Sequence, residues 1–80
     1  MTDSFNQQLA DIVKQHRKQR GLSQEGLAKF AGVGKTVVFD IEHGKETVKL
    51  STVLKILDVL NIQINLKSPL MDNEVYKGQG

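Results

Sequence analysis

Two short amphipathic segments joined by a glycine-containing turn constrain the fold more than any other feature of this chain. Ser23 and Gly32 bound the first segment, because Ser is a favoured helix N-cap and Gly a favoured C-terminal residue. The second segment is expected to begin at a cap on Gly34 and to end at Gly44. Residues 31–34 form the whole connection, so the sequence predicts two short helices packed across a tight turn.

The string Gly34-Lys35-Thr36 lies inside this pattern and could also belong to a phosphate-binding loop. That loop requires its first glycine at position 29, directly after a strand. Position 29 is Lys29, and the residues before it have helical spacing. A nucleotide site is therefore disfavoured. A helix-turn-helix motif accounts for the residues expected to begin or end its helices, which are Gly21, Ser23, Gly32, Gly34 and Gly44.

Helical spacing of apolar residues also flanks this pair of segments. A first helix is expected from about Phe5 to Gly21, with Leu9, Ile12 and Val13 on its apolar face. A fourth helix is expected from about Lys49 to Leu60. Its apolar stripe consists of Leu50, Val53, Leu54, Leu57 and Leu60. Ile56 and Val59 lie outside that stripe and are expected to be available to another molecule.

The apolar period changes from 3.6 to 2 at residues 61–67, which predicts a strand with Ile62, Ile64 and Leu66 on one face. A lone strand in a helical domain has two unpaired edges, which favour association. We therefore predict that it pairs with the same strand of a second copy. The expected interface of this homodimer is Ile56, Val59, Ile62, Ile64 and Leu66. In the alternative, the strand folds back on its own helices.

The length, charge and composition of the chain argue against several other classes of protein. With 80 residues, net charge +2 and no cysteine, the chain is expected to form one mainly α domain over residues 1–67, followed by a flexible tail over 68–80. It has no apolar run of ~18 residues and a polar N-terminus, so we expect a cytoplasmic, nucleoid-associated protein without a membrane partner. No catalytic constellation is visible, and His16 and His43 have no second ligand nearby. We therefore expect neither an enzyme, nor a metal site, nor a cofactor.

Residues 22–45, LSQEGLAKFAGVGKTVVFDIEHGK, resemble the lambda-repressor-like (XRE-type) helix-turn-helix family. Gly26 and Phe39 depart from that family's pattern, in which both positions are usually polar. Residues 53–67, VLKILDVLNIQINLK, place a helix directly before an alternating strand and resemble the HipB-like antitoxin subgroup. The resemblance implies a four-helix domain that binds double-stranded DNA.

In such a motif the second short helix enters the major groove, and its N-terminal residues contact base edges. The residues expected at the DNA are Ser23, Gln24, Gly34, Lys35, Thr36, Phe39, Asp40 and Lys45. Lys35 can donate to guanine, and Phe39 can contact a thymine methyl group or instead pack against Val37 or a neighbouring protomer. Asp40 is expected mainly to repel phosphate, or to orient Lys35 or Lys29, unless it accepts from a cytosine amine.

Other roles follow from the resemblance. It implies that Gln24 contacts the DNA backbone and braces the reading helix, and that Ser23 adds a phosphate contact to its capping role. Lys45 is a phosphate candidate at the end of the motif. Arg17 and Glu42 match a structural ion pair of the family, and charged side chains are seldom buried unless paired.

The resulting hypothesis is a dimeric transcriptional repressor. Two reading helices about 34 Å apart would bind the half-sites of a palindromic operator. The HipB-like resemblance implies an antitoxin that represses its own operon and binds a HipA-like kinase toxin. Two alternatives stay open: a stand-alone repressor of phage or restriction-controller type, and a protein–protein adaptor that has kept only the fold.

Overall fold

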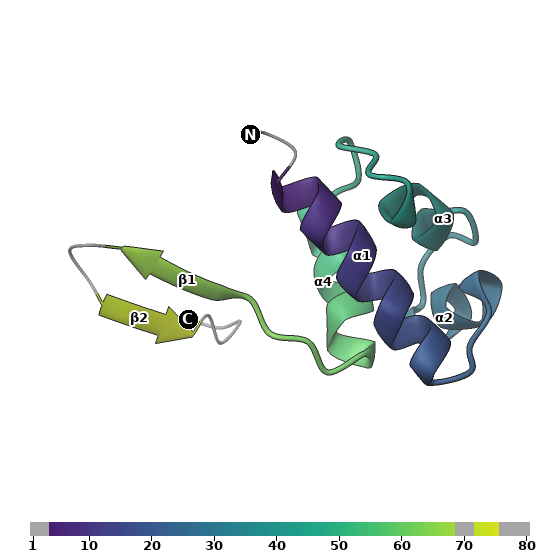
Figure 1. Ribbon diagram of the computed structural model, residues 1–80. Coiled ribbons are helices and arrows are strands. Elements are labelled where there is room, and N and C mark those ends of the chain that lie inside the picture. Colours follow the sequence, from purple (N-terminus) through teal and green to yellow (C-terminus); the bar gives the residue numbers. More distant parts are fainter. Residues whose placement is uncertain (1–3, 69–71, 76–80) are drawn as a thin grey trace.

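The computed structural model describes residues 4–68 and 72–75 of the chain. Within them, four helices precede a two-stranded hairpin, which confirms the predicted mainly helical fold. The elements are α1 (Ser4–Gln19), α2 (Gln24–Ala31), α3 (Val37–Glu42), α4 (Leu50–Val59), β1 (Asn65–Ser68) and β2 (Asp72–Val75). Helices α2 and α3 lie at one end of the molecule, and the hairpin projects from the other (Figure 1). None of the helices in these residues is both long and apolar enough to cross a membrane.

Helix α2 has the ends that its sequence predicts. Ser23 is its N-cap, and the Ser23 hydroxyl accepts a hydrogen bond from the backbone N–H of Gly26 at 2.8 Å. Gly32 ends the helix in the left-handed conformation, with φ of 71°, which residues with a Cβ rarely adopt. The N–H of Val33 then donates to the carbonyl of Ala28 at 3.0 Å and closes the turn.

Helix α3 begins later than expected. Its N-cap is Thr36 rather than Gly34, and residues 34–36 form a turn in which the N–H of Val37 donates to the Gly34 carbonyl at 3.1 Å. Gly34 has no side chain with which to cap a helix, so the chain turns before it becomes helical. The Thr36 side chain makes no capping hydrogen bond. The predicted end is confirmed, because Gly44 follows the helix with φ of 76°.

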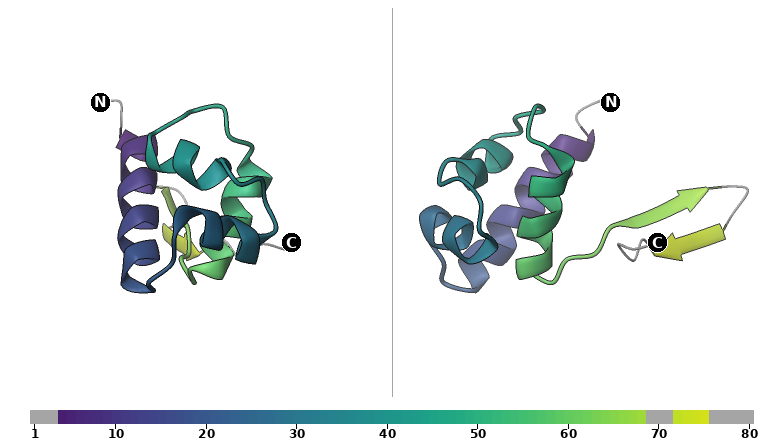
Figure 2. Two further views of the ribbon diagram at one scale, coloured as in Figure 1. Left: turned by 90° about the vertical axis from the view of Figure 1, so that its right-hand side faces the viewer. Right: turned by 180° about the vertical axis from the view of Figure 1, so that it is seen from behind.

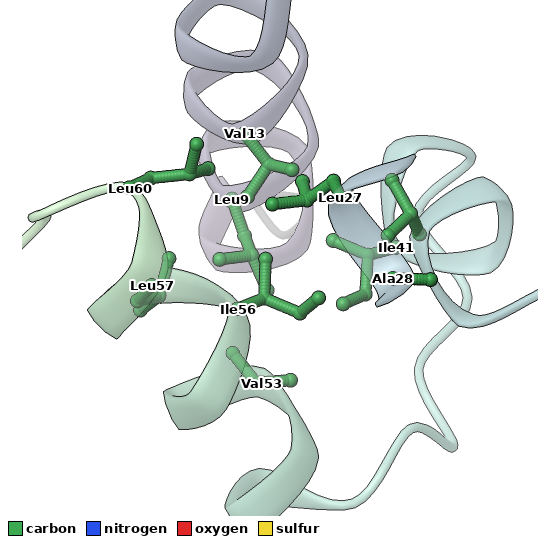
Figure 3. Packing of buried hydrophobic residues seen from close by; sticks show 10 residues of the cluster. Leu9, Val13, Leu27, Ala28, Ile41, Val53, Ile56, Leu57 and Leu60 are labelled. Atoms are coloured by element: carbon green, nitrogen blue, oxygen red, sulfur yellow. The ribbon is translucent and has the colours of Figure 1, made fainter. Parts of the chain in front are cut away.

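One aliphatic core joins the helices (Figure 3). Its largest completely buried side chains are Val13, Leu27, Val38, Ile41, Ile56 and Leu60. Ile56 points into the middle of this cluster, so the expectation that it contacts a second copy is wrong. Because α4 is apolar around more than half of its circumference, its sequence is compatible with two buried faces, and packing selects the one that contains Ile56. Leu50, assigned to the buried stripe, is 64% exposed instead.

The C-terminal segment also differs from its prediction. The strand begins at Asn65 rather than at residue 61, and β1 pairs antiparallel with β2, so that Leu66 is opposite Glu74. Residues 72–75, expected to belong to a tail, thus form a strand, while the rest of that tail (69–71 and 76–80) lies outside the described residues. The hairpin extends away from α2 and α3, as the view from behind also shows (Figure 2).

The segment that leads into the hairpin folds partly onto its own helices. Ile62 and Ile64 are half-buried and pack against the core, which is the alternative considered for this strand. Leu66 lies beyond them and is 58% exposed. The apolar face of the alternating segment is therefore divided between the protomer's own core and solvent.

Candidate nucleic-acid interface

A buried ion pair connects α1 to the end of α3. The Arg17 Nε donates to Glu42 Oε2 at 2.7 Å, and Arg17 Nη2 donates to Glu42 Oε1 at 3.0 Å, so the guanidinium binds the carboxylate in a bidentate manner. The Glu42 side chain is 2% exposed and that of Arg17 is 11% exposed. The ion pair expected from the family resemblance is thus formed, away from water.

Two further hydrogen bonds extend this pair to α2. Gln24 Nε2, at the start of α2, donates to Glu42 Oε1 at 3.0 Å. Arg17 Nη1 donates to the carbonyl of Leu22, in the loop between α1 and α2, at 2.8 Å. Glu42 therefore receives donors from two helices. This arrangement restrains the position of α3 relative to α1 and α2, which is the bracing role predicted for Gln24.

The network determines the charge state of Glu42. Burial alone raises the pKa of the Glu42 carboxyl group. Hydrogen bonds from Arg17 and Gln24, together with the positive charges of Arg17 and Lys14, outweigh that effect and hold the pKa below its ordinary value. The hydrogen bond to Glu42 likewise raises the pKa of Arg17 above its ordinary value, against the opposing effect of burial. Both residues are therefore ionised at neutral pH, as a structural pair requires.

The residues expected to contact bases lie in the turn before α3 and on the side of α3 that faces away from the core. Val38 and Ile41 point inward and are buried. Gly34, Lys35 and Thr36 are exposed in the turn before the helix, and Phe39 is 48% exposed on the helix itself. We call residues 34–36 and Phe39 the reading face. The structure brings them together next to the well-packed, hydrogen-bonded end of the domain.

Asp40 has a different partner from the one expected. Its Oδ2 lies 3.6 Å from the Nζ of Lys45, and the N–H of Lys45 donates to the Asp40 carbonyl at 3.0 Å. Neither Lys35 nor Lys29 is the cation that pairs with it, so that interpretation is wrong. Because the chain reverses at Gly44, Lys45 returns beside the helix that precedes it. The Lys45 side chain remains 55% exposed and can still reach a phosphate group.

Phe39 stacks on a residue that the sequence gave no direct reason to select. Its ring and the imidazole of His43 have centroids 4.0 Å apart and planes inclined by 29°. Within the protomer, the aromatic partner of Phe39 is thus His43. The spacing of four residues within a helix would have been the signal, because side chains at i and i+4 lie on one face.

Arg20, which directly follows α1, is a further cation and contacts α4. Its Nη2 donates to the carbonyl of Leu60 at 3.2 Å, at the C-terminal end of α4. That contact ties the ends of α1 and α4 together. Arg20 therefore serves the fold.

Comparisons with known proteins show which family has this arrangement of helices. The helix-turn-helix family HTH_3 matches residues 13–66, which include Arg17, the whole of α2 to α4 and the first residues of the hairpin. The chain belongs to this helix-turn-helix family. It is thus a transcriptional regulator of the lambda-repressor-like (XRE) type, and the predicted family and the mainly α, four-helix fold class are confirmed.

Individual members of the helix-turn-helix family are similar over most of the chain. An uncharacterised HTH-type transcriptional regulator, y4mF of Sinorhizobium fredii, is 38% identical over 58 residues, or 72% of this chain and 76% of the relative. Antitoxin HipB of Escherichia coli (strain K12) is 34% identical over 59 residues, or 74% of this chain and 67% of HipB. A chain of the solved HipA-HipB-O2-O3 complex superposes with a TM-score of 0.70 at 31% identity, covering 80% of this chain and 90% of that chain.

Proposed function

We propose that this protein is a sequence-specific repressor that inserts α3 into the major groove of double-stranded DNA. The observation that carries the proposal is the combination of an exposed reading face with a helix restrained from behind by Arg17, Gln24 and Glu42. A reading helix must be held in place, because a small displacement would misalign its donors with the base edges.

The residues of the reading face have distinct roles in this proposal. Lys35 donates to guanine O6 or N7, and Thr36 offers a hydroxyl group that is not used in capping. Gly34 allows close approach of the backbone. Ser23 and Gln24 at the start of α2, and Lys45 after α3, contact phosphate groups and set the register. Asp40 holds Lys45 beside the helix.

We further propose that the active form is a homodimer assembled around the C-terminal segment. A groove of about 590 Å³ lies between α1 and residues 62–66, and Phe5, Leu9, Leu57 and Leu66 are among its apolar lining residues. Phe5 and Leu66 are 57% and 58% exposed in the protomer. A second copy would cover them together with Val59, Ile62 and Ile64. Burial of such apolar surface is the usual source of dimer stability.

The finer role that we propose is that of a HipB-like antitoxin, which represses its own operon and binds a HipA-like kinase toxin. The proposal is supported by the similarity to HipB over 59 residues and by the 80% of this chain that a chain of the HipA-HipB-O2-O3 complex covers. Copurification from the native operon would test this role. Recovery of a second, kinase-like protein is expected. A dimer that carries DNA and no partner would instead identify a stand-alone repressor.

An electrophoretic mobility shift with the DNA upstream of the gene tests the proposed function itself. Binding should weaken steeply as salt is raised and should exceed binding to random DNA of equal length. Random and upstream DNA bound equally would contradict sequence specificity. No binding to either would favour an adaptor that has kept only the helix-turn-helix fold.

A further inference from the structure

Phe39 is a large apolar side chain on a surface expected to read polar base edges. It is 48% exposed on α3, where Val38 and Ile41 already fill the core. The ring has no hydrogen-bonding group. The largest apolar group that base pairs present in the major groove is the C5-methyl group of a pyrimidine. The chemistry of the side chain therefore restricts what it can recognise there.

His43 holds the Phe39 ring in a defined position. The imidazole stacks on the ring at a centroid distance of 4.0 Å, and so covers one of its two faces. The imidazole is itself anchored, because its Nδ1–H donates to the carbonyl of Phe39 at 2.8 Å. The two residues thus form a closed unit at the end of α3. A ring held in this way loses little conformational freedom when it meets a ligand.

We propose that Phe39, positioned by His43, recognises the C5-methyl group of a pyrimidine in the major groove, whether the base is thymine or 5-methylcytosine. This inference rests on the proposed function and names part of its specificity. Lys35 lies in the turn that precedes α3 and, in this proposal, donates to a neighbouring base pair. His43 acts through Phe39 as a positioning residue.

The first test replaces each thymine of the bound upstream site by uracil, which removes only the methyl group. We expect one position in each half-site at which the substitution weakens binding of the natural protein about 4-fold, the loss expected for one buried methyl group. Phe39→Ala should bind the thymine and uracil sites equally. The matched control is Phe30→Ala, which removes an equally large ring, 71% exposed on α2, and should keep the full preference for thymine.

The second test separates the positioning role of His43 from a merely structural one. His43→Ala should reduce the preference for thymine over uracil, whereas His43→Phe, which restores a stacked ring, should recover it. Melting temperatures of both variants identify any loss of folding. At the sensitive position, a 5-methylcytosine–guanine pair compared with a cytosine–guanine pair shows whether the methyl group alone is recognised. Equal binding of those two pairs would restrict the recognition to thymine.

Three results would overturn the inference. The first is that the natural protein binds its site, but replacement of thymine by uracil weakens binding at no position. The proposed repressor function would remain intact in that case. Another is a sensitivity that persists in Phe39→Ala. The last is a change in oligomeric state for Phe39→Ala in sedimentation without DNA, which would assign the ring to a protein contact. Failure to bind any upstream DNA would instead refute the proposed function.

Discussion

Arg17 and Glu42 lie 25 residues apart in the sequence and form the closest ion pair among the described residues, with Nε and Oε2 separated by 2.7 Å. The pair joins α1 to the last residue of α3, and Gln24 of α2 completes it. The orientation of the reading face thus depends on a charged group that is nearly inaccessible to water.

Removal of the cation should destabilise the fold strongly. Arg17→Met leaves Glu42 buried with Gln24 as its remaining donor, and we expect the free energy of unfolding to fall by about 3–5 kcal/mol. Urea denaturation measures this loss. Lys18→Met, at an exposed position of α1, is the control and should change stability by less than about 0.5 kcal/mol. Similar small effects of both substitutions would show that the pair contributes little.

The same pair should make stability dependent on pH. The pKa of Glu42 is lowered in the folded state, so the unfolded chain binds more protons and stability rises with pH. The contribution is complete above the ordinary glutamate pKa of 4.5, which applies to the unfolded chain, and is lost as the pH falls through the lower folded pKa. Urea denaturation between pH about 2.5 and 7 should show that the free energy of unfolding falls less steeply towards low pH for Glu42→Gln than for the natural protein. An equally steep fall in both proteins would contradict the contribution of Glu42 to the pH dependence. Glu46→Gln, which removes an exposed carboxylate, is the control for the change in charge.

Lys35 should contribute to specificity rather than to general affinity. We expect Lys35→Ala to weaken binding to the upstream site by about 1–3 kcal/mol and to relax the preference at one base pair. Quantitative mobility shifts on single-base variants of the site measure both effects. Lys55→Ala, on α4, removes the same charge away from α3 and should leave the base preferences unchanged. If Lys35→Ala lost equal affinity for specific and for random DNA, Lys35 would contact phosphate groups only.

Substitutions at two glycines should distinguish an effect on folding from an effect on DNA binding. A Cβ at Gly34 would meet Val37 Cγ2 at 3.7 Å, an ordinary contact, so Gly34→Ala should keep its melting temperature. Its affinity for DNA should fall, because the methyl group occupies the proposed path of close approach. Gly32→Ala should instead lose about 1–2 kcal/mol of stability, since Gly32 has φ of 71°. If Gly34→Ala binds DNA as well as the natural protein, the backbone at that position does not approach the DNA.

Leu66 and Ile64 should report on the dimer in different ways. Leu66 is exposed in the protomer, so Leu66→Lys should give a folded monomer with reduced operator affinity. Ile64 packs against the core, so Ile64→Lys should also lower the melting temperature. Sedimentation at micromolar concentration, combined with thermal unfolding, distinguishes the two results. A Leu66→Lys variant that remains dimeric with unchanged affinity would exclude this segment as the interface.

Local sequence alone predicted the helix ends that depend on the capping group or the backbone conformation of one residue. The α2 boundaries follow from Ser23, whose hydroxyl caps a helix, and from Gly32, which adopts positive φ. The inward positions of Val38 and Ile41 follow from helical periodicity. The pairing of Arg17 with Glu42 came from the resemblance to a known family, since no local pattern links residues so distant in sequence.

Tertiary structure decided the features for which the sequence allows more than one solution. The apolar surface of α4 exceeds what one core requires, and only packing against the other helices determines that Ile56 is buried and Leu50 exposed. Likewise, β1 could pair with any suitable edge, and β2 of the same chain supplies one. The partners of Asp40 and Phe39 depend on how the chain turns after α3. The spacing of apolar residues shows which of them share a helix face. What each face contacts is determined only when the helices pack together.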